Sequence, residues 1–595
     1  MYRKVALDSL RTYLRERGFD VMIIPSNDCH FGEYVPGYFN VIKWLSGFSG
    51  SAGTLVVTQN SAALWTDSRY FIQAAFQIQG TDVKLMKIKM EETPSIFQWI
   101  SSEYTEGCKI AIDGALVSYA EYCHFQKEVS PSKIIAIDDP FVELWRERPI
   151  LKFDKIELHE EKFSGESVVT KHKQIIDRLK IKGDFAYLLS TCDDIMWLCN
   201  IRGNDIDYNP VALSYLVITN EKIFLFVAPG SLSPEASLYL STQSVEIKKY
   251  DEITSFLKNL PESMIRIVFP EKISVKNYFA YCNSNTQVIN DPTFGGTVSY
   301  LKSIKNRVEI EGFNRAFLED GIAWCKLLKF IEDNIDSGLL NEYNVAKKLV
   351  EYRSRSIYYR GESFEPIIAF NKNGAAAHYS VDNEKNAAKI TKNGFLLMDT
   401  GAHYPFGTTD TTRTISLSKL SQKQIDDYTL ILKGMIQLSI AKFPKGTRGS
   451  QLDILARGPI LGIGKMYFHG TGHGIGHYLC VHEGPQSIRM EYNPVNLIPG
   501  MVLSNEPAVY VEGEYGIRTE NVLLVAPWYE NDINSFYQFE TLTLVPIDTT
   551  CVNKKLLGKE CIDWLNVYHK NIYKTLSPHL SKFESKWLKK KTKSI

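Results

Sequence analysis

Four acidic residues in the second half of the chain form two pairs, each centred on a turn. Asp399 and Asp410 flank a turn at residues 404–407, with strand-like sequence on both sides. Glu506 and Glu520 flank a glycine-containing turn in the same way. A hairpin at each turn would place the two carboxylates of a pair side by side. The spacing therefore predicts two acidic hairpins.

Carboxylates that converge in this way repel one another unless cations lie between them. Two divalent ions would neutralise the charge of four carboxylates. A single acidic hairpin is more often a solvated turn, so the hypothesis depends on both hairpins and on a histidine between them. Together these features predict a dinuclear metal site.

The histidine that fits this role is His473, at the centre of His469-Gly-Thr-Gly-His473-Gly-Ile-Gly-His477. Alternating glycines make a helix unfavourable, which argues against the helical H-x-x-x-H motif of mononuclear zinc proteases. Ile475 stands where a dinucleotide-binding glycine would be needed. The segment is predicted to be a loop or strand whose backbone approaches a site closely.

The elements around these residues can be placed from periodicity. Strands are predicted at 394–399, 408–415, 501–505 and 517–524, and a long amphipathic helix at 308–334. Arg518 and Glu520 would lie on one face of the last strand, although Arg518 could alternatively serve only to pair with an acid.

The N-terminal half is predicted to be α/β. Strands are expected at 21–24, 53–58 and 183–189, and the sequence at 194–203 echoes that at 44–50. This echo predicts two related α/β domains in tandem. The expected domains are an N-terminal α/β domain, a second and related α/β domain, and a third domain with a C-terminal extension at about 535–595. Their boundaries are 1–152, 153–305 and 306–595.

Composition limits the classes of partner. With 68 basic and 68 acidic residues the formal net charge is zero, so neither nucleic acid nor a membrane surface is expected as a partner. The N-terminus lacks the uninterrupted apolar stretch of a signal peptide, and no segment is apolar enough to span a membrane. None of the ten cysteines forms a C-x-x-C pair, so we expect free thiols and a cytoplasmic location.

Together, the motifs around these acids and histidines resemble those of the "pita-bread" metallopeptidases, and in detail those of the aminopeptidase P family in its long, three-domain, cytosolic form. The motifs are Met-Asp399-Thr-Gly, Gly-Thr-Thr-Asp410-Thr-Thr-Arg-Thr, His-Gly-Thr-Gly-His473-Gly-Ile-Gly, Val-His482-Glu-Gly-Pro, Asn-Glu506-Pro-Ala-Val-Tyr510 and Gly-Ile-Arg518-Thr-Glu520-Asn. The resemblance extends over nearly the whole chain. It implies a catalytic domain with a curved antiparallel sheet that holds the metals in its concave face.

The resemblance also implies roles for residues. Asp399 and Asp410 would hold one metal ion, and His473 and Glu506 the other, with Asp410 and Glu520 bridging them. Manganese is the family's usual metal, which suits a ligand set of four carboxylates and one imidazole, while cobalt and zinc stay open as alternatives. A hydroxide bridging the ions would be the nucleophile.

Further residues are implied around the substrate. His378, His482 and Glu506 would be catalytic, with Glu506 moving the proton. The substrate-binding residues would be His378, His469, His482, Tyr510 and Arg518. For a lone histidine such as His378, a purely structural role is the alternative reading.

The implied activity is hydrolysis of the peptide bond before a proline at the second position of a peptide. Two alternatives stay open: a prolidase, which cleaves only Xaa-Pro dipeptides, and a non-catalytic binding module with the same fold. A homodimer is also expected, partly from the resemblance. The second reason is the aromatic content of the extension, whose helix-like part, 559–576, could face a second subunit.

Overall fold

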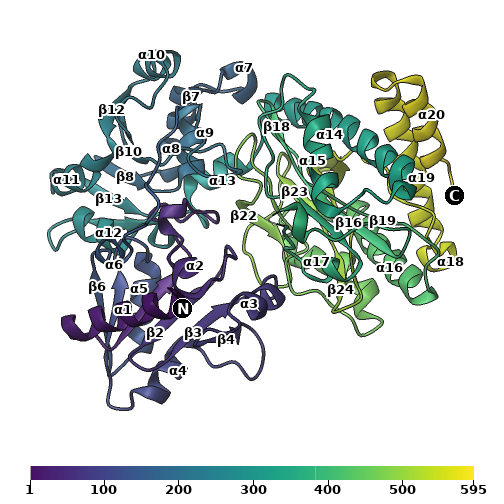
Figure 1. Ribbon diagram of the computed structural model, residues 1–595. Helices are drawn as coiled ribbons and strands as arrows, with labels where there is room; N and C mark the ends of the chain where they lie inside the picture. The colour runs from purple at the N-terminus through teal and green to yellow at the C-terminus, as the bar shows by residue number, and fades with distance from the viewer. Residues whose placement is uncertain (1, 382) are drawn as a thin grey trace. The chain divides into compact units, whose positions relative to one another are not determined.

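The computed structural model describes residues 2–381 and 383–595, which form two compact units (Figure 1). The first unit comprises Met1–His159 and Glu166–Val298, and the second comprises Glu160–Gly165 and Ser299–Ile595. Within the described residues, none of the helices is long and apolar enough to cross a membrane. All ten cysteines lie in this part of the chain and are free thiols.

The first unit contains two six-stranded sheets. The first sheet has the order β4-β3-β2-β1-β5-β6, and its strands are β1 (Val21–Pro25), β2 (Thr54–Thr58), β3 (Ala62–Thr66), β4 (Val83–Lys87), β5 (Lys109–Asp113) and β6 (Lys133–Ile137). The second has the order β12-β11-β10-β8-β13-β14, and its strands are β8 (Phe185–Leu189), β10 (Tyr215–Thr219), β11 (Ile223–Val227), β12 (Val245–Lys249), β13 (Ile265–Val268) and β14 (Val288–Asn290). A short ribbon joins β7 (Glu157–Leu158) to β9 (Ile201–Arg202).

The two sheets share one topology. In each, the first strand pairs antiparallel with the second and parallel with the fifth, and the third pairs parallel with the fourth. Strand order and strand direction therefore agree throughout. The predicted relationship between two tandem α/β domains is confirmed at this level.

Alternate residues of β1 explain why helices cover both faces of the first sheet. Met22 and Ile24 belong to one apolar core, and Val21 and Ile23 to the other. Because successive side chains point to opposite faces of a strand, an uninterrupted apolar run requires cover on both sides. The helices of this unit are α1 (Tyr2–Arg17), α2 (Val41–Ser46), α3 (Phe71–Gln77), α4 (Ile96–Glu103), α5 (Tyr119–Glu128), α6 (Phe141–Leu144), α8 (Val168–Leu179), α9 (Cys192–Cys199), α10 (Pro234–Thr242), α11 (Ile253–Lys258) and α12 (Val275–Tyr281).

The second unit is built on antiparallel strands. Its six-stranded sheet has the order β20-β27-β26-β23-β21-β22, and a three-stranded sheet has the order β15-β16-β19. These strands are β15 (Ile367–Phe370), β16 (Phe395–Thr400), β19 (Thr411–Ser416), β20 (Lys442–Pro444), β21 (Gly472–Gly474), β22 (Glu483–Ile488), β23 (Val502–Asn505), β26 (Asn521–Glu530) and β27 (Ser535–Thr541). Two small hairpins are β17 (His403–Tyr404) with β18 (Gly407–Thr408), and β24 (Ala508–Val511) with β25 (Tyr515–Arg518).

Helices cover these sheets. The predicted long helix is confirmed as α14 (Arg307–Asn334), which starts at a capping box formed by Asn306 and Glu309. At Gly312 on this helix a Cβ atom would lie 2.3 Å from the carbonyl oxygen of Phe406. The glycine thus lets the turn of the first acidic hairpin rest on the helix. The other helices are α7 (Glu161–Ser164), α13 (Thr297–Ser303), α15 (Glu342–Arg353), α16 (Gln422–Ser439), α17 (Gly449–Leu461), α18 (Lys554–Leu557), α19 (Lys559–Leu576) and α20 (Lys582–Lys591).

Two sequence predictions need correction. The strand predicted at 517–524 is interrupted, because β25 ends at Arg518 and β26 begins at Asn521. The helix predicted at 559–576 is present as α19, but its apolar face is not left for a second subunit. Leu565, Tyr568 and Ile572 are buried in the same core as residues of α16. Folding of the extension onto its own unit uses the surface that had suggested a dimer contact.

Candidate metal centre

The first acidic pair lies where two strands meet. Strands β16 and β19 pair antiparallel with Asp399 opposite Thr412, and Asp410 directly precedes β19. The small β17–β18 ribbon closes the turn between them. The hairpin predicted from the spacing is therefore present, and both aspartates are buried.

The second acidic pair belongs to the hairpin of β24 and β25. The register places Ala508 opposite Arg518, and the two glutamates lie two residues farther along, Glu506 before β24 and Glu520 after β25. The predicted hairpin is again present. Glu520 lies in the gap between two strands, so it does not share a strand with Arg518.

His473 is the central residue of the short strand β21. At Gly472 a Cβ atom would lie only 2.0 Å from the carbonyl oxygen of Ser504 on β23. The Ser504 hydroxyl in turn accepts a hydrogen bond from the backbone N–H of His473 at 3.0 Å. Glycine at position 472 therefore permits the close strand approach that the sequence predicted.

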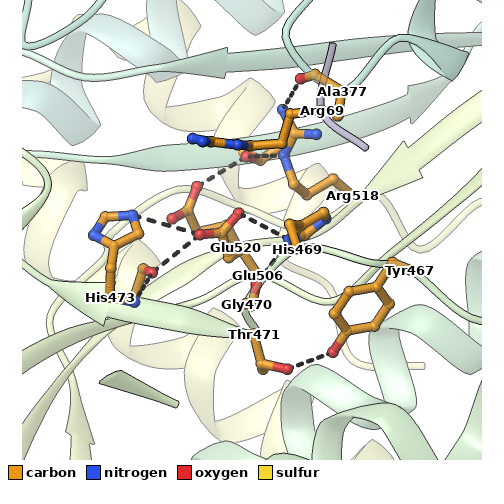
Figure 2. A network of polar contacts seen from close by, with 12 residues as sticks. Arg69, Ala377, Tyr467, His469, Gly470, Thr471, His473, Glu506, Arg518 and Glu520 are labelled. Atoms are coloured by element: carbon orange, nitrogen blue, oxygen red, sulfur yellow. Dashed lines mark hydrogen bonds and ion pairs between the residues drawn. The ribbon is translucent and has the colours of Figure 1, made fainter. Parts of the chain in front are cut away.

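The second unit brings these groups together. Ligand atoms of Asp410, His473 and Glu520 all lie within 4.8 Å of one another. Nε2 of His473 is 3.5 Å from Oδ2 of Asp410 and 3.4 Å from Oε1 of Glu506. In Figure 2 the side chains of His473, Glu506 and Glu520 point toward one another.

The hydrogen bond of His473 fixes which ring nitrogen faces the acids. Nδ1 lies 2.9 Å from the carbonyl oxygen of Gly474, and a carbonyl only accepts, so Nδ1 carries the proton of the neutral ring. Nε2 then directs a lone pair at two carboxylates. That contact is repulsive in the absence of a cation and is the usual orientation of a metal-binding histidine.

In two of the carboxylates, one oxygen accepts a hydrogen bond and the other oxygen has no partner. Arg518 donates to Oδ2 of Asp399 at 2.6 Å, and Thr412 donates to Oε2 of Glu520 at 2.8 Å. Oδ1 of Asp399 and Oε1 of Glu520 are buried and have no hydrogen-bond partner. Buried polar atoms are rarely left in this state, so hard oxygen donors are available for cations such as divalent metal ions.

The electrostatics agree with this arrangement. Burial, followed by repulsion from neighbouring carboxylates, raises the pKa of Asp410 and the pKa of Glu506 well above their ordinary values. Burial and the nearby Asp399 raise the pKa of Glu520 to about 7. The protein alone thus favours protons on these groups, and divalent cations would replace those protons.

A chain of hydrogen bonds links Arg518 to His469. Arg518 Nη1 donates to the Tyr510 hydroxyl at 2.6 Å, and that hydroxyl lies 3.0 Å from Nε2 of His469. Nδ1 of His469 is 2.7 Å from the carbonyl oxygen of Gly470. Every group of the chain is satisfied if Tyr510 donates to His469. The chain fixes the orientation of His469, whose Nδ1 is 4.0 Å from Oε2 of Glu506.

The remaining predicted histidines lie at different distances from this centre. The ring of His482 meets the ring of His473 edge to face, with centroids 4.3 Å apart. His378 follows a 3₁₀ turn at Asn371–Ala375, and its neighbour Ala377 accepts from Arg518 at 3.5 Å. The structure therefore places the ring of His482 beside that of His473, and places Ala377, the neighbour of His378, in contact with Arg518.

Several supporting residues were missed from the sequence. Arg353 donates to the hydroxyl of Thr400 and pairs with Asp320, which accepts from Thr409. These threonines directly follow Asp399 and directly precede Asp410. Arg413 and Thr412 stand within a motif that had been recognised, but no spacing rule indicates what a buried arginine contacts.

Comparison with known proteins gives a consistent result. Residues 315–527 match the model of metallopeptidase family M24, and residues 7–147 and 147–309 each match a creatinase/prolidase N-terminal domain. Residues 535–595 match the C-terminal region of peptidase M24. The repeated N-terminal match agrees with the shared topology of the two sheets.

Individual relatives extend over nearly the whole chain. Xaa-Pro aminopeptidase 1 of Dictyostelium discoideum is 35% identical over 99% of this chain and 96% of its own length. The crystal structure of X-prolyl aminopeptidase from Caenorhabditis elegans, described as a cytosolic enzyme with a di-nuclear active site, matches with a TM-score of 0.94 at 33% identity and covers 100% of both chains.

A more distant structure shares the fold. The Xaa-Pro dipeptidase of Bacillus anthracis is 22% identical, has a TM-score of 0.51, and covers 64% of this chain and 99% of its own. The predicted fold class is confirmed: two related α/β domains precede a catalytic domain of the pita-bread type. The chain belongs to metallopeptidase family M24 and, within it, to the aminopeptidase P group.

Proposed function

We propose that the protein is a dinuclear-metal aminopeptidase that hydrolyses the bond before a proline at the second position of a peptide. The observation that carries this proposal is the convergence of the buried Asp410 and Glu520 with the half-buried His473 and Glu506. Oδ1 of the buried Asp399 and Oε1 of Glu520 are left without partners. The names of the full-length relatives support the substrate class.

The donor geometry supports the division of ligands expected from the family. Asp399 and Asp410 would hold one ion, His473 and Glu506 the other, and Asp410 and Glu520 would bridge them. Oxygen-rich donors favour manganese, with cobalt and zinc as alternatives. When bound, two such ions activate a water for attack near neutral pH and polarise the carbonyl of the substrate.

The chain's own residues would position the substrate and move protons. Glu506 is proposed to take the proton of the attacking water and pass it to the leaving amine. Its Oε1 also accepts from Ser504 at 3.3 Å, which orients the carboxylate. His482 and His378 are proposed to stabilise the reacting carbonyl by hydrogen bonds that strengthen as negative charge develops.

The hydrogen-bonded chain Arg518–Tyr510–His469 is proposed to shape the side of the site that receives proline. The bond before proline is a tertiary amide without an N–H. A site that required that N–H would be left with an unpaired group, whereas a pocket lined by Tyr510 and His469 makes no such demand.

Three substrates test the proposal. Purified protein supplied with manganese is expected to release arginine from Arg-Pro-Pro and the first residue from a longer Xaa-Pro peptide. Cleavage of an Xaa-Pro dipeptide alone would identify a prolidase. Failure to cleave any of the three, with two ions bound, would identify a non-catalytic binding module.

Three further proposals concern organisation. Domain boundaries at 1–152, 153–305 and 306–595 are supported by family matches that meet at residue 147 and end at residue 309. A cytoplasmic location is supported by the description of the worm enzyme. A homodimer now rests on the family resemblance alone, since α19 packs within its own unit. Sedimentation at low micromolar concentration would test it against the monomer mass of 67.8 kDa.

A further inference from the structure

Arg413 is a buried cation that, among the described residues, has no carboxylate partner. Its side chain is fully enclosed, and its donors end on carbonyl, amide and phenol oxygens. Buried charges normally pair with an opposite charge because desolvation is costly. When the guanidinium donors of a buried arginine instead bond neutral oxygens, the planar group fixes the positions of those oxygens.

The acceptors of Arg413 fall into two groups. One group belongs to the metal centre: the carbonyl oxygens of Thr412 and Glu520 and the side-chain oxygen of Asn521. The other belongs to the C-terminal extension: the carbonyl oxygens of Val545 and Pro546, at 2.8 and 3.2 Å, and the hydroxyl of Tyr568, at 2.9 Å. The guanidinium therefore joins the segment of Glu520 to the extension.

Helix α19 holds the extension side of this junction. The hydroxyl of Tyr568 accepts from Arg413, and its one proton can go to Val545 O at 2.9 Å or to Oδ1 of Asn521 at 3.2 Å. The ring of Tyr568 stacks on Trp564. Nε2 of His569 accepts from the backbone N–H of Ile547 at 3.1 Å. Two adjacent residues of one helix thus fix the strand-like segment that Arg413 contacts.

Glu520 needs such support because it lies in the break between β25 and β26. Its backbone N–H donates to the carbonyl oxygen of Thr412 at 3.1 Å, and its carbonyl oxygen accepts from Arg413. Its position therefore depends on these bonds and on the Thr412 hydroxyl, rather than on a continuous ladder of strand hydrogen bonds.

We infer that the C-terminal extension is a positioning element of the metal centre, which acts through Tyr568 and Arg413 on the backbone of Glu520. This inference rests on the proposed role of Glu520 as a bridging ligand. Neither Tyr568 nor Arg413 is proposed to bind metal or substrate. Arg413 bonds the backbone carbonyl of Glu520, not its carboxylate, and Tyr568 bonds Arg413. Together they fix the position of the proposed bridging carboxylate of Glu520. That position determines the affinity for the more weakly bound of the two ions.

The test measures manganese binding to the full-length, metal-depleted protein. Calorimetric titration gives the two affinities, and electron paramagnetic resonance detects the signal of a coupled manganese pair. Tyr568→Phe removes only the hydroxyl and is expected to lower the affinity for the more weakly bound ion about tenfold. Arg413→Lys keeps the positive charge but loses the planar set of guanidinium donors. It is expected to lower the affinity for that ion about 100-fold. Tyr573→Phe is the matched control on the same helix, since Tyr573 is half-buried and its hydroxyl forms no hydrogen bond with the residues that the structure describes; it is expected to bind manganese like the wild type.

The outcomes separate the inference from the proposed function. If the wild type itself fails to bind two ions, the proposed metal centre is wrong. If the wild type binds two and Tyr568→Phe binds both as tightly, with an unaltered paired signal, the inference is wrong even when the variant unfolds at a lower temperature. Recovery of peptidase activity by Tyr568→Phe at raised manganese concentration would support it, because a variant damaged only in its fold would not respond to the ion.

Discussion

The stability of the metal-free protein should fall as the pH rises, which is opposite to the usual behaviour of a protein with ion-paired acids. Burial and the nearby Asp399 raise the pKa of Glu520 from 4.5 to about 7 in the folded protein. A carboxyl group with a raised pKa binds its proton more tightly when folded. Its contribution is complete below pH 4.5 and is lost as the pH passes through 7.

The size of the effect follows from the shift. At 1.36 kcal/mol per pKa unit, the change in Glu520 alone removes about 3 kcal/mol of the free energy of unfolding between pH 4.5 and pH 8. The raised pKa values of Asp410 and Glu506 act in the same direction. For a unit of this size, about 3 kcal/mol corresponds to a decrease in melting temperature of roughly 5–10 °C.

Scanning calorimetry of chelator-treated protein from pH 4.5 to 8 measures this decrease in the transition of the catalytic unit. Glu520→Gln should flatten the slope. Glu514→Gln, on the exposed turn of the same hairpin, should leave it unchanged. Saturating manganese should reverse the trend, because the ions replace the protons and bind better as the pH rises. A melting temperature that is constant or increases with pH in the metal-free wild type would refute the electrostatic account of the site.

Three further outcomes are expected. Asp410→Ala should lower kcat/KM by more than about 1,000-fold and reduce the bound manganese measured by elemental analysis, because a ligand shared by both ions is lost; full activity with both ions present would disprove the ligand assignment. His482→Ala should lower kcat by about 100-fold or more at unchanged metal content, and loss of the ions instead would show that the residue is a ligand or a structural support. Arg353→Met should destabilise the catalytic unit by about 3–5 kcal/mol in calorimetry, because Asp320 and Glu362 are left as unpaired buried charges. Arg355→Met, which breaks an exposed pair with Glu351 and a cation–π contact with Tyr352, should cost far less; equal melting temperatures for the two variants would contradict this reading.

The acidic hairpins were predictable because their geometry is local. The distance along the chain from Asp399 to Asp410, and from Glu506 to Glu520, is short enough for a turn to dictate which residues meet. The alternating glycines around His473 likewise report a local requirement for close strand approach, as seen at Gly472. The repeat of the two N-terminal domains was detectable because the segment at 194–203, which echoes 44–50, follows the first strand of its sheet, as 44–50 does.

Other features depend on contacts between distant parts of the chain and could not be read in this way. The break of the strand at Glu520 serves its contact with Thr412, more than a hundred residues earlier. The aromatic residues of α19 have the composition of an interface, and composition does not reveal whether the partner is a second subunit or the same one. Here the partner is α16 and the core behind the metal centre.

The placement of three buried arginines follows one rule that explains how an acidic centre can be both rigid and open to cations. An arginine that gripped the metal-binding oxygens would hold the carboxylates firmly but would also compete with the ions. Arg353 avoids this by pairing with Asp320 and Glu362, which are not ligands, and Arg413 avoids it by donating only to neutral oxygens. Arg518 does touch a proposed ligand, Asp399, but its two bonds to that carboxylate both end on Oδ2 and leave Oδ1 without a partner. Rigidity is thus supplied largely through backbone and other atoms that are not proposed metal donors, and the remaining carboxylate oxygens stay available for two divalent ions.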